Sequence, residues 1–448
     1  MGVTQLRLFN PHDLGTNVLT EVSLTSERQR LEEKFAPLLR EEFHLARLVS
    51  YGGNKEVPIL RLYRYKEAFA FHFVEEFIQR FGLTGRDCLF DPFCGMGTTL
   101  FAGMQKGIPT VGIDKLPIAV FVAQTFLLFF SLKEGELRST FAELKNRVRH
   151  ADLAPIASDV AIMKVAFPPE NLIALRQWKK VIDALEPPLR DVFLLLFFSI
   201  LEPCSYTSKD GQFLRLNRKK RVGEPEELLE RKVSEAERDL QLLKQLWPHE
   251  KAVAPKVCLG DARDLGDISF PQRPTAIITS PPYANRYDYT RTYSLELCFH
   301  FVSNFEELKS LRFNILRSHI ESKVDNSEEP PHPAVKEVVD ILRSQRKELN
   351  NPRIPDMLTG YFVDMWRVVQ EWARILAPGA RVAMVVDNVR FAGELLPVDL
   401  VLSEMAEKTG FHVWEILVAR YKGNSSQQMR KYGRVPVRES VVVWQKEQ

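Results

Sequence analysis

The chain has 448 residues, of which 45% are hydrophobic and 27% are charged, a composition typical of a soluble globular protein. One typical domain holds about 100 to 200 residues, so this length predicts a core domain with a large insertion or a second lobe. The formal net charge is only +3, which excludes attraction of a polyanion by a strong overall field and leaves that role to local basic clusters.

Neither a metal site nor a membrane segment is expected. The five cysteines are scattered, without Cys-x-x-Cys or Cys/His ligand spacing, which argues against structural zinc and for a reducing cytoplasm. The longest apolar runs, 119–130 and 192–201, fall short of the about 18 to 20 residues of a membrane span and are predicted to be buried helices. The first residues lack the apolar core of a signal peptide. We therefore expect a cytoplasmic protein that does not bind a membrane.

The first part of the chain alternates between helical and strand patterns. Residues 26–48 have the apolar spacing of an amphipathic helix, and residues 61–81 are expected to form a further helix. A strand is expected over 87–91, followed by a glycine-rich turn, a helix over 98–106 and a second strand over 110–114. Such alternation is typical of an α/β fold with a parallel sheet.

A long segment, 132–252, interrupts this alternation. It contains helical patterns at 171–185 and 226–246, and a polar, basic loop at 205–221 lies between them. The many charges of 226–246 are typical of a solvated helix face. We expect a largely helical insertion, with the basic loop as its best candidate for contact with a polyanion.

The strand pattern resumes after the insertion. A third strand starts at Lys256 and leads to an acidic turn at Asp261, and a fourth ends at the motif TSPPY. The remaining pattern predicts helix 361–376, strand 381–387, helix 398–408 and strands 412–421 and 439–445. The expected fold class is therefore α/β, a doubly wound Rossmann-like sheet of seven strands with a largely helical insertion.

The first chemical motif is DPFCGMGTT, from Asp91 to Thr99, at the end of the first strand. Gly95 and Gly97 let the backbone approach a bound ligand closely and adopt dihedral angles that a Cβ would forbid. The next strand ends in Asp114, 23 residues after Asp91. An acidic residue at the tip of the second strand is where this architecture receives the ribose hydroxyls of a nucleoside cofactor.

The second chemical motif is TSPPY, from Thr279 to Tyr283, directly after an apolar run. Pro281 and Pro282 remove two backbone donors and fix two φ angles, so the carbonyls just before them are held rigidly outward. Outward carbonyls of this kind suit an amino group, and the ring of Tyr283 offers a face for stacking.

Together the two motifs resemble those of the amino-methylating DNA methyltransferases, which move a methyl group from S-adenosylmethionine to the exocyclic nitrogen of cytosine (N4) or adenine (N6). The family's F-x-G-x-G is matched by Phe93, Gly95 and Gly97, and its catalytic (D/N/S)-P-P-(Y/F/W) begins here at Ser280. Serine at that position is associated in the family with N4-cytosine more than with N6-adenine. The resemblance covers residues 60–130 and 255–445, and the middle only weakly.

The resemblance implies a role for each motif residue. Asp91 would hold the amino group of the donor, Phe93 would pack on it, Asp114 would hold its ribose and Asp261 would contact its adenine. Tyr65, Gly95, Gly97 and Thr98 complete the expected donor-binding set. Ser280 Oγ and the Pro281 carbonyl would accept hydrogen bonds from the target amine, and Pro282 and Tyr283 complete the expected catalytic set, with Tyr283 stacking on a base flipped out of the duplex.

The expected partner is double-stranded DNA. Candidate contacts are the basic loop residues Arg215, Arg218, Lys219, Lys220 and Arg221, and Arg286, Tyr287 and Arg291 beside the catalytic motif. A further basic stretch occupies 420–438. The expected organisation is an N-terminal helical segment over 1–60, a catalytic domain over 61–131 and 253–448, and a helical insertion over 132–252 as the candidate DNA-recognition region.

Three alternatives remain open at this point. The chain could be an N6-adenine DNA methyltransferase, an RNA or protein methyltransferase of the same fold, or a recognition subunit with a dormant site. The motifs imply restriction–modification, but the recognition sequence, a companion restriction endonuclease and the oligomeric state are left open by the sequence.

Overall fold

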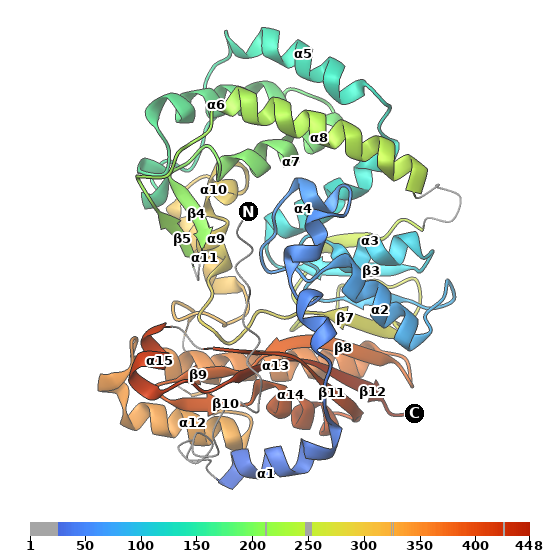
Figure 1. The fold of residues 1–448 in the computed structure, drawn as a ribbon, viewed down its shortest axis with the longest axis vertical. Helices are drawn as coiled ribbons and strands as arrows, with labels where there is room; N and C mark the ends of the chain where they lie inside the picture. Colours follow the sequence, from blue (N-terminus) through green and yellow to red (C-terminus); the bar gives the residue numbers. More distant parts are fainter. Residues whose placement is uncertain (1–25, 211–212, 247–252, 324, 326, 424–425) are drawn as a thin grey trace. The chain divides into compact units, whose positions relative to one another are not determined.

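A computed structural model describes residues 26–448 except 211–212, 247–252, 324, 326 and 424–425. The chain divides into two compact units, each with its own strands and helices (Figure 1). Unit 1 consists of Met1–Val49, Ala262–Tyr287 and Leu316–Gln448, and unit 2 consists of Ser50–Asp261 and Asp288–Ile315.

Unit 1 contains five sheet strands in the order β1-β11-β12-β8-β7. The pairs β7–β8 and β1–β11 are parallel, whereas β12 runs antiparallel to both β8 and β11. The strands are β1 Leu39–Glu41, β7 Ala276–Thr279, β8 Arg381–Asp387, β11 Phe411–Lys422 and β12 Val437–Lys446, with a separate ribbon of β9 Val389–Phe391 and β10 Glu394–Leu396. β8 is buried on both faces, which explains its continuous apolar run.

The helices of unit 1 bury one apolar stripe each. In the longest of them, α13, Leu358, Phe362, Met365, Val369 and Trp372 recur at helical spacing and all are buried. The helices are α1 Ser26–Phe35, α12 Pro333–Ser344, α13 Ile354–Ile375, α14 Val398–Glu407 and α15 Ser426–Tyr432.

Unit 2 contains three parallel sheet strands in the order β2-β3-β6. They are β2 Leu89–Asp91, β3 Thr110–Asp114 and β6 Lys256–Leu259, and the helices α2 Phe71–Phe81, α3 Thr98–Gln105 and α4 Pro117–Leu128 accompany them. Parallel strands place their carboxyl ends at one edge, so Asp91, Asp114 and the turn that holds Asp261 all lie at the same edge.

The insertion of unit 2 is a helical layer with one hairpin. Its elements are α5 Glu136–Val148, α6 Pro169–Asp183, α7 Leu189–Leu201, the antiparallel pair β4 Thr207–Asp210 and β5 Phe213–Leu216, and α8 Pro225–Leu246. Three short helices follow later in the chain, α9 Tyr289–Thr292, α10 Ser294–Glu296 and α11 Phe305–Asn314. Figure 1 shows α8 running along α5, α6 and α7, with which it is in contact. Only the outer side of α8 is therefore a solvated face, because Leu229, Val233, Leu240 and Leu243 are buried.

Four expectations about the elements need correction. Residues 26–48 do not form one helix, because Pro37 follows the end of α1 and β1 begins two residues later. The helix expected over 61–81 begins only at Phe71, whose N–H donates to Asn54 Oδ1 at 2.7 Å instead of to a helical carbonyl. The loop over 205–221 contains the hairpin β4–β5, and β1 raises the strand count from the expected seven to eight.

Among the described residues, no single helix has both the length and the apolar character to cross a bilayer. The pair Pro117–Ser131 and Glu136–Val148 passes that test only when taken together across a bend of 114°. The two apolar runs of the sequence lie in α4 and α7, and most of their side chains are buried, as predicted.

Candidate active site

The glycine turn after β2 has a backbone that favours glycine. Gly95 and Gly97 have φ angles of 49° and 86°, both in the left-handed region. A Cβ on Gly97 would stand 2.8 Å from the Cβ of Ala123, so the turn packs directly on α4. The Gly97 N–H donates to the Cys94 carbonyl at 2.7 Å, and the turn leads into the N-terminus of α3. A close backbone approach at a helix N-terminus is suited to a polar ligand.

Two carboxylates brace this turn. Asp114 accepts the Gly95 N–H on Oδ2 at 3.0 Å and the Leu116 N–H on Oδ1 at 2.8 Å. Burial raises the pKa of Asp114 to about 6, against the opposing effect of these backbone donors. Asp91 is buried and accepts the Phe93 N–H at 3.1 Å. The two acidic residues singled out from the sequence therefore lie beside the glycine turn.

The other expected donor-binding residues surround the same turn. A Cβ on Gly95 would stand 3.2 Å from Cε1 of Tyr65, so that ring lies against the glycine. Thr98 Oγ1 is buried and has no hydrogen-bond partner among the described residues, and Phe93 is partly exposed. Asp261 accepts from Lys115 Nζ at 3.0 Å. A buried hydroxyl without a partner, next to a turn where a Cβ would clash, fits a bound nucleoside with its own polar groups.

The TSPPY motif, which holds the predicted catalytic residues, lies in unit 1 at the carboxyl end of β7. The last residue of β7, Thr279, is in register with Met384 of β8, and the Ser280 hydroxyl lies 3.5 Å from the Val385 carbonyl oxygen. The hydroxyl is the donor in this long contact, so the lone pairs of Ser280 Oγ remain available as acceptors.

Behind the motif, Tyr283 is tied to a group of charged side chains in unit 1. Its hydroxyl donates to Glu439 Oε1 at 3.2 Å. Lys422 Nζ donates to the same oxygen at 2.5 Å and to Asp387 Oδ2 at 3.2 Å, and Arg420 donates to Glu439 Oε2. Burial raises the pKa of Tyr283 well above its usual value, and burial also raises that of Asp387. This cluster could not be predicted from the sequence, because its charged members lie on three strands, β8, β11 and β12, that are distant in the chain.

The arginine beside the motif has an unusual conformation. Arg286 has a φ of 71°, rare for a residue with a side chain, and its Nε is buried without a hydrogen-bond partner among the described residues. Burial lowers its pKa. Tyr287 is buried, and Arg291, on α9 of unit 2, lies 3.4 Å from Asp288 Oδ2.

The hairpin β4–β5 together with residues 217–221 after it is here called the basic hairpin, and it contains both exposed and structural cations. Arg215, Lys219 and Arg221 are exposed, and Arg218 lies 5.6 Å from the ring centroid of Tyr206. Lys220 is different, because its Nζ donates to the carbonyls of Glu202 and Thr207 at 2.7 and 2.5 Å, and burial lowers its pKa.

The basic stretch 420–438 also has structural cations beside the exposed Arg430, Lys431 and Arg434. Besides Arg420 and Lys422, Arg438 donates to Glu32 at 2.8 Å and to Asp399 at 3.1 Å.

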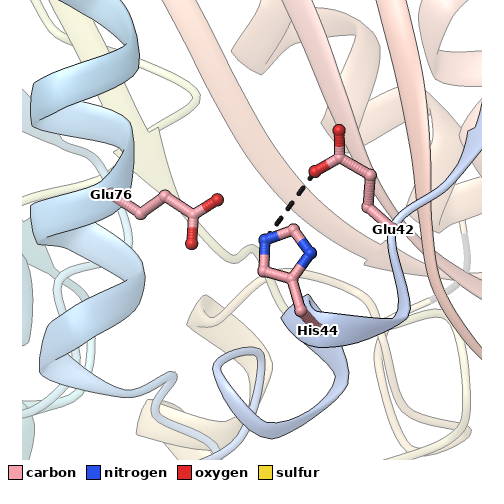
Figure 2. Close-up of side chains that lie close together, drawn as sticks. All are labelled: Glu42, His44 and Glu76. Atoms are coloured by element: carbon pink, nitrogen blue, oxygen red, sulfur yellow. Dashed lines mark ion pairs between the residues drawn. The ribbon is translucent and has the colours of Figure 1, made fainter.

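A separate charged pair in unit 1 bears on metal binding. His44 Nε2 lies 3.8 Å from Glu42 Oε2 (Figure 2). Glu76, also drawn there, belongs to α2 of unit 2, where it pairs with Arg80 at 2.7 Å. The expectation of no metal remains a prediction.

The class of protein follows from three features of unit 2. They are the parallel strands, the glycine turn after the first of these strands, and the carboxylate at the tip of the second. The chain is a Rossmann-like, S-adenosylmethionine-dependent methyltransferase.

Comparison with known proteins identifies the family within this class. The chain is 33% identical over 476 aligned positions to the type II methyltransferase M.BsoBI of Geobacillus stearothermophilus, covering 94% of this chain and 92% of that protein. It is 34% identical over 453 positions to the type II methyltransferase M.AvaI of Anabaena variabilis, and this alignment covers 93% of this chain and 92% of that protein. The chain therefore belongs to the type II methyltransferases, a family of DNA methyltransferases in restriction–modification.

The other comparisons add less. No protein-family model matches the chain. The rRNA methyltransferase aviRa of Streptomyces viridochromogenes aligns with 84% of this chain and 85% of its own at 12% identity, with a TM-score of 0.31, too low to support an inference. The resemblance drawn from the two sequence motifs, the fold class and the methyl donor are confirmed.

Proposed function

We propose that the enzyme transfers a methyl group from S-adenosylmethionine to N4 of cytosine at a specific site in duplex DNA. The observation that carries this proposal is Ser280, the serine form of the (D/N/S)-P-P-(Y/F/W) motif, which the family resemblance associates with N4-cytosine more than with N6-adenine. The names of the relatives do not distinguish cytosine from adenine, so N6-methyladenine is the competing outcome.

The chemistry requires acceptors for the target amine. An exocyclic amine is a weak nucleophile because its lone pair is delocalised into the ring. Ser280 Oγ, with its weak bond to Val385, and the Pro281 carbonyl would accept from the two N–H groups and hold the nitrogen in a more electron-rich geometry. Such catalysis is mainly positioning.

The proposed role of Tyr283 is to stack on the flipped base. Flipping costs a few kcal/mol, and stacking on an aromatic ring returns about 1 to 3 kcal/mol. The bond from its hydroxyl to Glu439 fixes the ring orientation before the base arrives. This preorganisation reduces the entropy lost on binding.

The donor would be held by the residues around the glycine turn of unit 2. After accepting two backbone N–H groups, the Asp114 carboxylate can still accept hydrogen bonds from ribose hydroxyls. The Thr98 hydroxyl, which has no partner among the described residues, could also form a hydrogen bond with the donor. Phe93 would pack on the donor, Asp91 would hold its amino group, and Asp261 would contact its adenine. The bound donor supplies an activated methyl group on a sulfonium.

The proposed DNA contacts are the exposed hairpin cations and Arg286. Arg215 lies on β5, and Arg218, Lys219 and Arg221 lie in the turn and loop directly after it, which supports 132–252 as the recognition region. Arg286 has a buried, unpartnered Nε among the described residues, and a DNA phosphate would supply the acceptor it lacks. Tyr287 and Arg291 are proposed as weaker contributors, because Tyr287 is buried and Arg291 is ion-paired.

Methyl-tritiated donor tests which polymer is the substrate. The protein is incubated with duplex DNA, RNA and protein, and Ser280→Ala is compared with Ser344→Ala, a control at an exposed serine at the end of α12. We expect label in duplex DNA for the wild type and Ser344→Ala, and little for Ser280→Ala. Label confined to RNA or protein would contradict the proposal, and donor binding without label in any polymer would indicate a dormant site.

A further inference from the structure

A cation is buried in unit 2, separated from the glycine turn by two aromatic rings. Lys209, on β4 of the basic hairpin, forms an ion pair with Glu296 of α10 at 2.5 Å, and their side chains are 4% and 1% exposed. The Tyr63 hydroxyl donates to the same Glu296 oxygen at 2.8 Å. The second oxygen, Oε2, is buried without a partner among the described residues. A buried ion pair contributes little net stability, because removing two charges from water costs about as much as their attraction returns. The position of this pair in unit 2 suggests a different role.

Lys209 lies over aromatic rings. Its Nζ is 4.3 Å from the ring centroid of Tyr293 and 5.1 Å from that of Tyr63, both within the range of a cation–π contact. The pair with Glu296 holds the ammonium group in place, so Tyr293 is supported on one face by a fixed cation.

Tyr293 also supports Tyr65. The two rings are stacked, with centroids 4.8 Å apart and an angle of 13° between their planes. The Tyr293 hydroxyl donates to Glu67 Oε2 at 2.6 Å and accepts the Lys66 N–H at 3.2 Å. Tyr293 is therefore bound to the segment that carries Tyr65 by a ring contact and two hydrogen bonds.

Tyr65 in turn lies against the glycine turn. Its Cε1 would be 3.2 Å from a Cβ on Gly95, a residue whose N–H is bound by Asp114. A continuous series of contacts thus runs from Lys209 through Tyr293 and Tyr65 to Gly95, entirely within unit 2.

We propose that Lys209 is a positioning residue for the donor site, and that it sets the place of Tyr65 through Tyr293. The ion pair with Glu296 keeps the ammonium at the depth where it supports the stack. This inference rests on the proposed placement of the donor at the glycine turn, but it does not depend on which base or polymer is methylated.

Substitution of Lys209 by methionine tests the proposal, with Lys179→Met as the matched control. Lys179 is a buried lysine of the same unit that pairs with Asp183 at 2.6 Å on α6, outside the donor-binding residues. If the ring stack contributes as measured aromatic pairs do, Lys209→Met should raise the donor Kd by about 2- to 10-fold in calorimetry without DNA. Lys179→Met should leave that Kd unchanged. An unchanged Kd in folded Lys209→Met would overturn the proposal.

Steady-state kinetics distinguish a positioning role from a merely structural one, because only the former changes the KM for the donor alone. In Lys209→Met the KM for the donor should rise, while kcat at saturating donor should stay close to wild type, the pattern of lost ground-state binding. A fall in kcat with no change in the donor KM would contradict a positioning role. Failure of the proposed N4-cytosine product would leave the donor Kd shift intact, so the two proposals can fail separately.

Two further sets of variants keep the test decisive if Lys209→Met folds poorly. Lys209→Met alone leaves the Glu296 carboxylate buried without its cation. The double variant Lys209→Met with Glu296→Gln removes that charge, so it should be more stable than Lys209→Met while its donor Kd remains raised. Tyr293→Phe keeps the stack and should bind the donor nearly as wild type, whereas Tyr293→Leu removes it and should match Lys209→Met. Equal donor affinity in Tyr293→Phe, Tyr293→Leu and the wild type would overturn the proposal.

Discussion

Replacing Asp114 with asparagine tests the donor site by a change of one charge and one acceptor. The carboxylate accepts the Leu116 N–H on Oδ1 at 2.8 Å and the Gly95 N–H on Oδ2 at 3.0 Å. Asparagine has a single acceptor oxygen, so its amide nitrogen must face one of these N–H groups. The variant therefore weakens both the turn and the acceptor proposed for the ribose.

The size of the effect follows from the bonds involved. A lost hydrogen bond to a charged group costs about 1.5 to 3 kcal/mol, which corresponds to a rise of about 10- to 150-fold in the donor Kd. The unsatisfied N–H at the turn should also lower the free energy of unfolding by about 1 to 3 kcal/mol. Alanine would remove both turn bonds and is expected to destabilise the fold further.

Calorimetric titration with the donor, together with thermal unfolding, separates the two effects. Asp87→Asn is the matched control, because Asp87 also accepts a turn N–H, from Thr84 at 2.8 Å, at an exposed position. We expect Asp87→Asn to bind the donor as wild type. A folded Asp114→Asn with unchanged donor affinity would refute the assignment of Asp114 to the ribose.

Three further predictions concern the same residues and the DNA surface. Since the pKa of Asp114 is raised from 3.8 to about 6, its contribution to stability falls as pH rises through that range. Donor affinity should fall below pH 6 by up to about tenfold per pH unit. A flat calorimetric profile in the wild type, or the same slope in Asp114→Asn, would contradict this. In methylation assays Tyr283→Phe should retain most activity, because Lys422 and Arg420 still satisfy Glu439, and Tyr283→Ala should lose most; equal losses would exclude stacking. Lys219→Ala should lower the slope of log affinity for DNA against log salt by about 0.9 at unchanged melting temperature. Lys220→Ala should lower the melting temperature, and the reverse pattern would count against the assigned roles.

Local patterns in the sequence predicted much of the fold. β3 and β8 lie where their apolar runs predicted them, because a strand buried on both faces has a continuous apolar sequence. The prediction failed where a single residue overrides the pattern, as Pro37 does after α1, or where the pairing is distant, as between β1 and β11. The hairpin β4–β5 was interpreted as a loop because its polar sequence lacks the apolar alternation of a strand.

The candidate site was predictable to the extent that its residues are neighbours in sequence. The glycine turn and TSPPY are continuous motifs, and Asp114 follows from its place at the end of a strand. Glu439 and Lys209 were missed because their partners, Tyr283 and Glu296, lie 156 and 87 residues away. Buried charges that meet only in the folded chain leave no local pattern.

Mass spectrometry of nucleosides tests the central claim most directly. Unmethylated duplex DNA is incubated with the wild-type protein and S-adenosylmethionine, digested to nucleosides and compared with DNA treated with Ser280→Ala. The account predicts N4-methylcytosine in the first sample and little or none in the second. N6-methyladenine without N4-methylcytosine would contradict the role given to Ser280 in choosing the base.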